Sequence, residues 1–254
     1  MTDATTSLVA APSARAEWTA FRRFLARPRL PERAAPFSGS SLAAILRMFG
    51  LDILLMAALA LIAGAVMATG FELPDTALAG MEITPWLAFA VVAGAPFLEE
   101  IVFRGWLSGR PGHVLAIAII AVGIVILTQT SLTRSDGPVN LKAIGTSLAM
   151  FAGAGFALFA LRGRGAMDWF QRAFPLFFWL STLAFACVHL FNFDEGALWV
   201  LLPLVLPQFV LGSILGYLRV NYGLWSSMVL HALHNGTALG LVWIGTNYAA
   251  GAGP

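Results

Sequence analysis

The sequence predicts an all-α, polytopic membrane protein, a bundle of about seven transmembrane helices. Three observations lead to this class. Of the 254 residues, 59% are hydrophobic and only 11% are charged, whereas soluble domains carry about 25% charged residues. Apolar runs recur that are close to the ~20 residues needed to cross a bilayer. Finally, the basic residues are distributed unevenly over the connecting segments, as membrane topology requires.

The N-terminal residues 1–41 form a segment of a different composition. They are rich in Ala, Pro, Ser and Arg, which predicts a cytoplasmic tail without stable structure. An alternative for residues 17–27 is a short amphipathic helix on anionic lipid. The segment contains no nucleic-acid-binding motif, so we expect the lipid bilayer, and no nucleic acid, as its partner.

Seven apolar segments follow and make up a transmembrane domain over residues 42–246, with a short tail at 247–254. The first contains Asp52 near its start, which we place at the membrane interface. The predicted spans are 45–69, 84–108, 113–133, 142–161, 174–193, 197–218 and 224–246.

The charges of the loops predict the orientation of these spans. Loop 70–83 carries three acidic residues and no Lys or Arg. With the N-terminus in the cytoplasm, every Lys and Arg except Arg134 and Lys142 falls on the cytoplasmic side, as the positive-inside rule requires. We therefore expect a multi-pass protein of the plasma (inner) membrane with its N-terminus in the cytoplasm and its C-terminus outside.

Two adjacent carboxylates and an arginine interrupt the second apolar segment. Charge inside a bilayer costs roughly 2.5–3.5 kcal/mol per residue, so such groups are expected to pair or to carry function. Glu100 and Arg104 are four residues apart and share a helical face, which predicts an ion pair. Glu99 points about 100° away around the helix and needs partners on other helices.

Polar residues on two later segments are the candidate partners of Glu99. His189 lies in the fifth segment, and His231 and Asn235 lie four apart on one face of the seventh, with His234 nearby. Such a set could activate a water. Glu99 would be the general base, His189 would position the water, and the other two side chains would donate to an oxyanion.

Other interpretations of these residues remain open. The same Glu and His side chains could form a proton relay in a proton-coupled transporter, or a catalytically silent scaffold could use them as contacts between helices. A Cys187–His189 dyad is disfavoured because side chains two positions apart point to nearly opposite faces of a helix. Ser213 with His231 would make a Ser–His dyad, but small residues in this context favour helix packing.

Three motifs in order resemble a known family. Residues 99–104 match E-E-x-x-x-R, residues 185–189 match F-x-x-x-H, and residues 231–235 match H-x-x-x-N. Each lies on an apolar segment. Together they resemble the CAAX protease and bacteriocin-processing (CPBP, or Abi) family of intramembrane proteases, over about residues 84–246.

The resemblance implies an intramembrane endopeptidase that hydrolyses a peptide bond of a membrane-associated protein or peptide. It implies a catalytic set of Glu99, Glu100, His189, His231 and Asn235, while Arg104 is the structural partner that its spacing to Glu100 predicts. A single divalent metal, zinc, held by Glu99, His189 and His231 is one implied mechanism, and a metal-free glutamate mechanism is the other. The usual zinc signature H-E-x-x-H is absent.

One departure from the family concerns the spacing of its motifs. About ninety residues separate the first motif from the second in this chain, where the family usually places them on successive helices. We therefore predict a catalytic core over 84–246 with an inserted helix pair at 113–161. A pair of spans preserves the relative direction of the motif helices.

Overall fold

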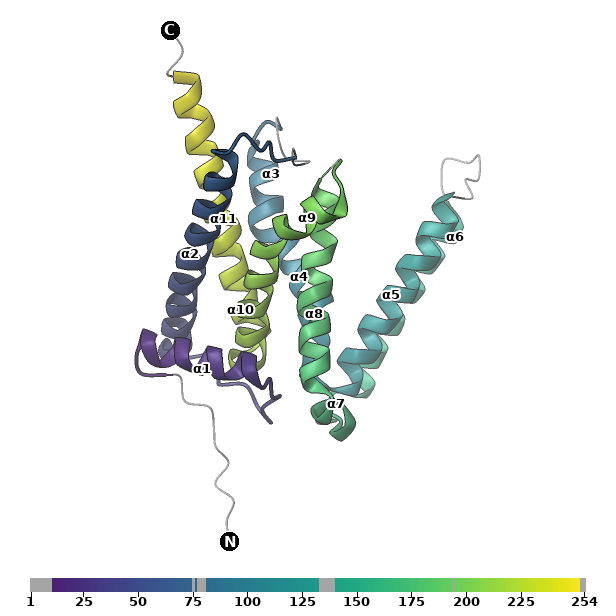
Figure 1. The fold of residues 1–254 in the computed structure, drawn as a ribbon. Coiled ribbons are helices and arrows are strands. Elements are labelled where there is room, and N and C mark those ends of the chain that lie inside the picture. Colours follow the sequence, from purple (N-terminus) through teal and green to yellow (C-terminus); the bar gives the residue numbers. More distant parts are fainter. Residues whose placement is uncertain (1–10, 75, 77–80, 133–139, 194, 252–254) are drawn as a thin grey trace. The chain divides into compact units, whose positions relative to one another are not determined.

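Helices dominate the computed structural model, which describes residues 11–74, 76, 81–132, 140–193 and 195–251 (Figure 1). Thr76 and Phe193 form an isolated β-bridge, and these ranges contain no strand. The predicted all-α class is confirmed. In chain order the elements are α1 Ala14–Ala26, α2 Gly39–Met67, α3 Pro85–Phe89, the π-helix η1 Ala90–Gly94, α4 Ala95–Arg104, the 3₁₀-helix η2 Gly105–Ser108, α5 Pro111–Leu132, α6 Leu141–Ala160, α7 Asp168–Arg172, α8 Phe174–Val188, the 3₁₀-helix η3 His189–Asn192, α9 Leu198–Leu204, α10 Leu206–Tyr222 and α11 Leu224–Gly251.

Five helical stretches among the described residues are long and apolar enough to cross a membrane. The bent pair of α9 and α10, which meet at 42°, makes a sixth if it is counted as one span. The predicted count of seven is not confirmed. Although α11 has 28 residues, its two histidines and two asparagines lower its hydropathy, and it is not among these stretches. The five are Gly39–Met67, Pro85–Ser108, Pro111–Gln129, Leu141–Ala160 and Phe174–Asn192.

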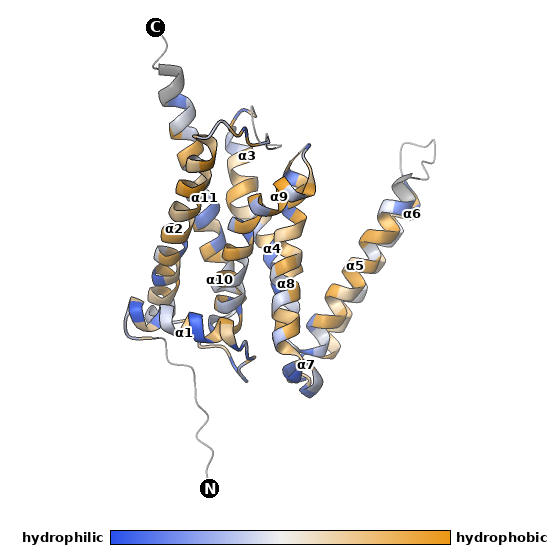
Figure 2. Ribbon diagram, in the orientation of Figure 1, coloured by the Kyte–Doolittle hydropathy of each residue, from blue (hydrophilic) through white to orange (hydrophobic). Residues whose placement is uncertain are grey.

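Apolar residues make up most of these helices, as the orange ribbons in Figure 2 show, and many of their large side chains are exposed. Leu61 on α2 is 76% exposed and Phe156 on α6 is 72% exposed. Only 6% of the most apolar part of α2 is buried within the protein. Soluble proteins rarely expose contiguous apolar surface of this extent, whereas a bilayer solvates it. The chain is therefore a multi-pass membrane protein.

The chain divides into two compact units, residues 1–104 with 175–254 and residues 105–174. In the second unit α5 and α6 pack along each other. A Cβ atom on Gly112 would lie 3.0 Å from the Ala157 carbonyl oxygen, and one on Gly123 would lie 2.5 Å from the Met150 sulfur, so both glycines allow the close approach. The helix pair predicted at 113–161 corresponds to these two helices, and its status as an insertion stays a prediction.

The first unit is built on α2, α10 and α11, with α4 and α8 packed beside them. Glycines let α10 approach α8 closely. A Cβ on Gly216 would lie 2.7 Å from the Phe178 ring, and one on Gly212 would lie 3.1 Å from the Phe185 ring and 3.2 Å from Arg104 Nη2. Ser213, between them, donates to its own helix at the Phe209 carbonyl. These small residues therefore serve packing.

The N-terminal segment is ordered where the structure describes it, so the predicted unstructured tail over 1–41 is wrong there. Its helix α1 lies across the ends of α2 and α10 (Figure 1). Glu17 is fully buried and accepts hydrogen bonds from the hydroxyls of Tyr217 and Tyr222, at 2.7 and 2.8 Å. Composition could not reveal this docking because the partners of Glu17 and Phe21 lie some 200 residues away.

Two helix ends differ from the predicted spans. The first span begins at Gly39 instead of residue 45, because Ser38 accepts a hydrogen bond from the Ser41 amide and caps the helix. The last continues to Gly251, so the predicted tail at 247–254 is helical over its first five residues. The N-terminal ten residues and residues 252–254 lie outside the described part of the chain.

Candidate active site

A break in helical hydrogen bonding sets the position of the carboxylate motif. Residues Ala90–Gly94 are π-helical, and the amide of Ala95 donates to the carbonyl of Ala90, five residues back. In an α-helix the Ala95 amide would instead donate to the Val91 carbonyl, four residues back. The next residue, Pro96, has no N–H to donate. The Val91 carbonyl is therefore left without a backbone donor, immediately before the helix that carries Glu99 and Glu100.

Asn235 on α11 supplies the missing donor. Its side-chain Nδ2 donates to the Val91 carbonyl oxygen at 2.9 Å. A buried carbonyl without a partner destabilises a fold by about 1–3 kcal/mol, so this bond holds α11 against the π-helix. The structure thus places Asn235 on the backbone before the carboxylate motif, with no described contact to either glutamate.

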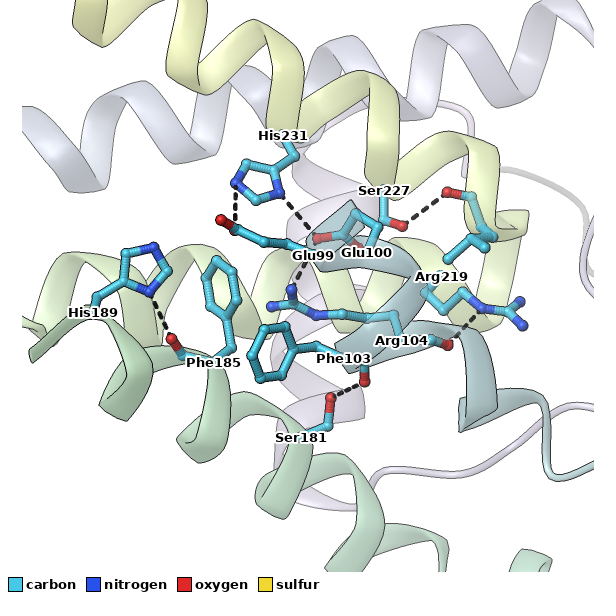
Figure 3. Close-up of polar contacts among 11 residues, drawn as sticks. Glu99, Glu100, Phe103, Arg104, Ser181, Phe185, His189, Arg219, Ser227 and His231 are labelled. Atoms are coloured by element: carbon cyan, nitrogen blue, oxygen red, sulfur yellow. Dashed lines mark hydrogen bonds and ion pairs between the residues drawn. The ribbon is translucent and has the colours of Figure 1, made fainter. Parts of the chain in front are cut away.

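Glu100 and Arg104 form the predicted ion pair, which is confirmed. Arg104 Nη1 lies 2.8 Å from Glu100 Oε1, and both side chains are fully buried. The carbonyls at the end of their helix α4 are capped from outside it. Ser181 on α8 donates to the Phe103 carbonyl at 2.6 Å, and Arg219 Nε on α10 donates to the Arg104 carbonyl at 2.9 Å. Two helices, α8 and α10, therefore hold this end of α4 (Figure 3).

His231 lies between the two carboxylates (Figure 3). Its Nδ1 is 3.0 Å from Glu100 Oε1, and its Nε2 is 3.7 Å from Glu99 Oε2. Because a carboxylate only accepts, Nδ1 carries a proton whenever Glu100 is ionised. With Arg104 and both carboxylates charged, one negative charge remains, and a second proton on His231 would make the cluster neutral.

The two carboxylates differ in access. The Glu99 side chain is 29% exposed, whereas that of Glu100 is fully buried. Glu100 is occupied by two partners, Arg104 and His231, through one oxygen. Glu99 is the carboxylate that can meet a water or a substrate.

Phe185 connects the imidazoles to the arginine (Figure 3). Its buried ring lies 3.8 Å from the Arg104 guanidinium carbon, and its centroid is 4.7 Å from the ring of His189 and 5.5 Å from that of His231. A guanidinium over an aromatic face is stabilised by the ring quadrupole. Sequence reasoning included Phe185 only as a letter of the F-x-x-x-H motif, and the structure shows it to be the shared packing surface of the site.

His189 begins the 3₁₀ turn at the end of α8 and has a fixed tautomer. Its Nδ1 donates to the Phe185 carbonyl oxygen at 2.7 Å, which leaves an acceptor at Nε2 when the ring is neutral. The structure brings His189 to the Phe185 ring beside His231, with no described polar contact between His189 and Glu99.

Asp52 and His234 form a second buried contact that sequence reasoning missed. Asp52 is fully buried in α2, and its Oδ2 accepts from His234 Nδ1 at 2.8 Å. This burial is within the protein, so the predicted place of Asp52 at the membrane interface stays a prediction. Asp52 is the only charge between Arg47 and Glu72, and this isolated charge is the signal that could have predicted a buried partner.

The described residues contain no group of three His, Cys, Asp or Glu side chains able to hold a metal ion. Glu99 Oε2 and His231 Nε2 come within 3.7 Å of each other. Nδ1 of His231 is used by Glu100 and Nδ1 of His189 by a backbone carbonyl, which leaves Nε2 of each ring as the nitrogen that a metal would use. The zinc site stays a prediction. Cys187 is a half-buried free thiol.

The fold and this site define a helical membrane protein with a carboxylate–imidazole cluster buried among α4, α8 and α11. Residues 81–237, more than half of the chain, match the family model described as type II CAAX prenyl endopeptidase Rce1-like. The chain belongs to this family, and the predicted resemblance is confirmed. Membership indicates a CAAX-type endopeptidase activity at the membrane. No curated protein and no solved structure matches the chain.

Proposed function

We propose that the protein is an intramembrane endopeptidase in which Glu99 activates a water to hydrolyse a peptide bond. The observation that carries the proposal is that the two carboxylates beside His231 differ in burial and in pairing. Glu100 is buried and paired, while Glu99 is partly exposed and only approached by His231 Nε2 at 3.7 Å. A general base needs such a free, accessible carboxylate.

In the proposed hydrolysis, Glu99 acts first as a base and then as an acid. Glu99 accepts a proton from the water as the water oxygen bonds to the carbonyl carbon of the substrate. His189 Nε2, the acceptor left by the bond from Nδ1 to Phe185, would receive the other water hydrogen as a hydrogen bond and fix the direction of attack. Protonated Glu99 then donates to the leaving amine nitrogen as the carbon–nitrogen bond breaks.

The oxyanion that forms on the substrate needs donors. His231 Nε2, when protonated, and the second N–H of Asn235 are our candidates, because the first N–H of Asn235 is used by the Val91 carbonyl. Removing one donor of this kind typically costs ~10²–10³ in kcat. Arg104 supports the site indirectly, through Glu100 and the Phe185 ring.

The family description suggests a substrate with a C-terminal C-a-a-X sequence and a prenylated cysteine, a membrane-associated protein or peptide. The test is cleavage of a farnesylated C-a-a-X peptide by the full chain in proteoliposomes, with Glu99→Gln as the matched control. Release of the tripeptide by wild type, and its loss in Glu99→Gln, supports the proposal. Equal release by both variants contradicts it. Proton flux without cleavage would support a transporter instead.

A further inference from the structure

The contact between Asp52 and His234 lies outside the cluster described above, although it involves the same helix α11. Asp52 is on α2, before the residues 81–237 that match the family model. Its carboxylate is fully buried, and among the described residues its Oδ1 has no hydrogen-bond partner. The single bond from His234 Nδ1 at 2.8 Å is thus the only described polar contact of a buried carboxylate.

Such a carboxylate holds its partner tightly. A buried carboxylate without its hydrogen-bond donor is strongly unfavourable, so the packing of α2 on α11 that keeps His234 in reach is favoured over rotated alternatives. His234 is itself only 18% exposed. The contact therefore fixes one face of α11 against α2.

The same short stretch of α11 makes two other polar contacts, each to a different element. His231 reaches Glu99 and Glu100 on α4, and Asn235 reaches Val91 in the π-helix. Relative to His231, residue 234 lies about 60° to one side of the helix axis and residue 235 about 40° to the other. His231 and Asn235 therefore face α4 and the π-helix before it, while His234 faces α2. Together they define the rotation of α11 about its own axis.

The effect of a small rotation can be estimated from helix dimensions. A helix with its side chains has a radius of about 5–6 Å, so a rotation of about 10° moves a side-chain tip by about 1 Å. A misplacement of about 1 Å at a reacting group can lower a rate ~10²-fold. Since His231 Nε2 faces Glu99 at 3.7 Å, a shift of this size would change that contact substantially.

We propose that Asp52 is a positioning residue of the active site, which acts through His234 to hold α11 at the rotation that directs His231 toward Glu99. The catalytic interpretation of this role rests on the proposed function. Asp52 touches no reacting group, and the partners of His231 and Asn235 limit how far α11 can rotate when Asp52 is replaced. The expected effect is therefore a partial loss in kcat with an unchanged KM.

The kinetic test uses Asp52→Leu, Asp52→Asn and the double variant Asp52→Leu with His234→Leu. Both leucine variants should lower kcat about 10- to 100-fold with KM within about twofold. Asp52→Asn keeps an oxygen acceptor for His234 Nδ1 and should retain most of kcat. The double variant leaves no polar group unpaired, so it tests the proposal even if Asp52→Leu does not fold.

Met48→Ala is the matched control, because Met48 is fully buried one turn before Asp52 on the same face of α2. It should lower the melting temperature while leaving kcat unchanged. An unchanged kcat in both folded leucine variants overturns the proposal, and so does a kcat loss in Met48→Ala as large as theirs. A loss in Asp52→Asn equal to that in the leucine variants also contradicts it.

A second measurement separates this proposal from the proposed function. Nitrogen NMR of ¹⁵N-histidine-labelled protein reports which nitrogens of His231 carry protons. The His231 signals should change in the double leucine variant and stay constant in Met48→Ala, whether or not the protein cleaves a peptide. Failure of wild type to cleave any C-a-a-X peptide refutes the proposed function alone, whereas unchanged His231 signals in the leucine variants refute the positioning role.

Discussion

Glu100→Gln should lower the stability of the protein, whereas Glu99→Gln should leave its stability nearly unchanged and lower its activity. Glu100→Gln keeps a side-chain oxygen for Arg104 Nη1 and His231 Nδ1 but removes the charge that balances a fully buried guanidinium. Breaking a buried ion pair from one side costs about 3–5 kcal/mol. At roughly 2–4 °C per kcal/mol for a chain of this size, the melting temperature should fall by roughly 6–20 °C.

Glu99→Gln is the isosteric control one residue away. The Glu99 side chain is 29% exposed, and its one described partner, His231, is 3.7 Å distant, so its charge contributes little to stability. We expect a melting temperature within a few degrees of wild type, as surface changes usually give, and a cleavage rate reduced at least ~10²-fold, the scale of losing a general base.

The double variant Glu100→Gln with Arg104→Met tests the cause of the instability. It removes both charges of the buried pair and keeps an apolar side chain against the Phe185 ring, so part of the lost stability should return. The assays are thermal melts in detergent and cleavage rates of the reconstituted variants. An unstable Glu99→Gln beside a well-folded, inactive Glu100→Gln would reverse our assignment of base and structural partner.

Three further predictions concern the fold, the topology and the metal. Gly216→Ala should lower stability by about 1–3 kcal/mol, because its Cβ would lie 2.7 Å from the buried Phe178 ring, while Gly64→Ala, which meets nothing within 4 Å, should not; thermal melts of both decide this. Reporter fusions should place residue 1 in the cytoplasm and residue 254 outside; a common side for both ends would contradict the predicted orientation. If Glu99 acts without a metal, cleavage should survive chelation, with well under one zinc per chain by elemental analysis; reversible loss of activity on chelation would support the zinc mechanism instead.

The sequence was most informative where a rule is local. The apolar runs located every long helix, and the i, i+4 spacing predicted the contact of Glu100 with Arg104. The separation of Glu99 from that pair also follows from helix geometry alone. The motif residues on α8 and α11 were correctly assigned to helices, but their partners were not predictable from spacing.

What the sequence could not provide are contacts between distant segments. His231 contacts Glu100 as well as Glu99. Asn235 donates to the Val91 carbonyl, which lacks a backbone donor because a π-helical turn precedes Pro96. Composition indicated a tail where α1 instead docks through Glu17, a buried acid whose partners lie on α10. Each error concerns a polar group whose environment depends on tertiary packing.

The π-helical turn has a consequence for how the family can vary in length. It holds one residue more than an α-helical turn, so deleting any single residue between Ala90 and Gly94 would let the segment return to α-helical pairing. Everything after the deletion would keep nearly its rotation relative to α3, because the wide turn and an α-helical turn each carry the chain about once around the axis. Glu99 and Glu100 would still face His231. Related chains are thus expected to differ by the presence or absence of one residue in this turn while their motif residues keep their orientation.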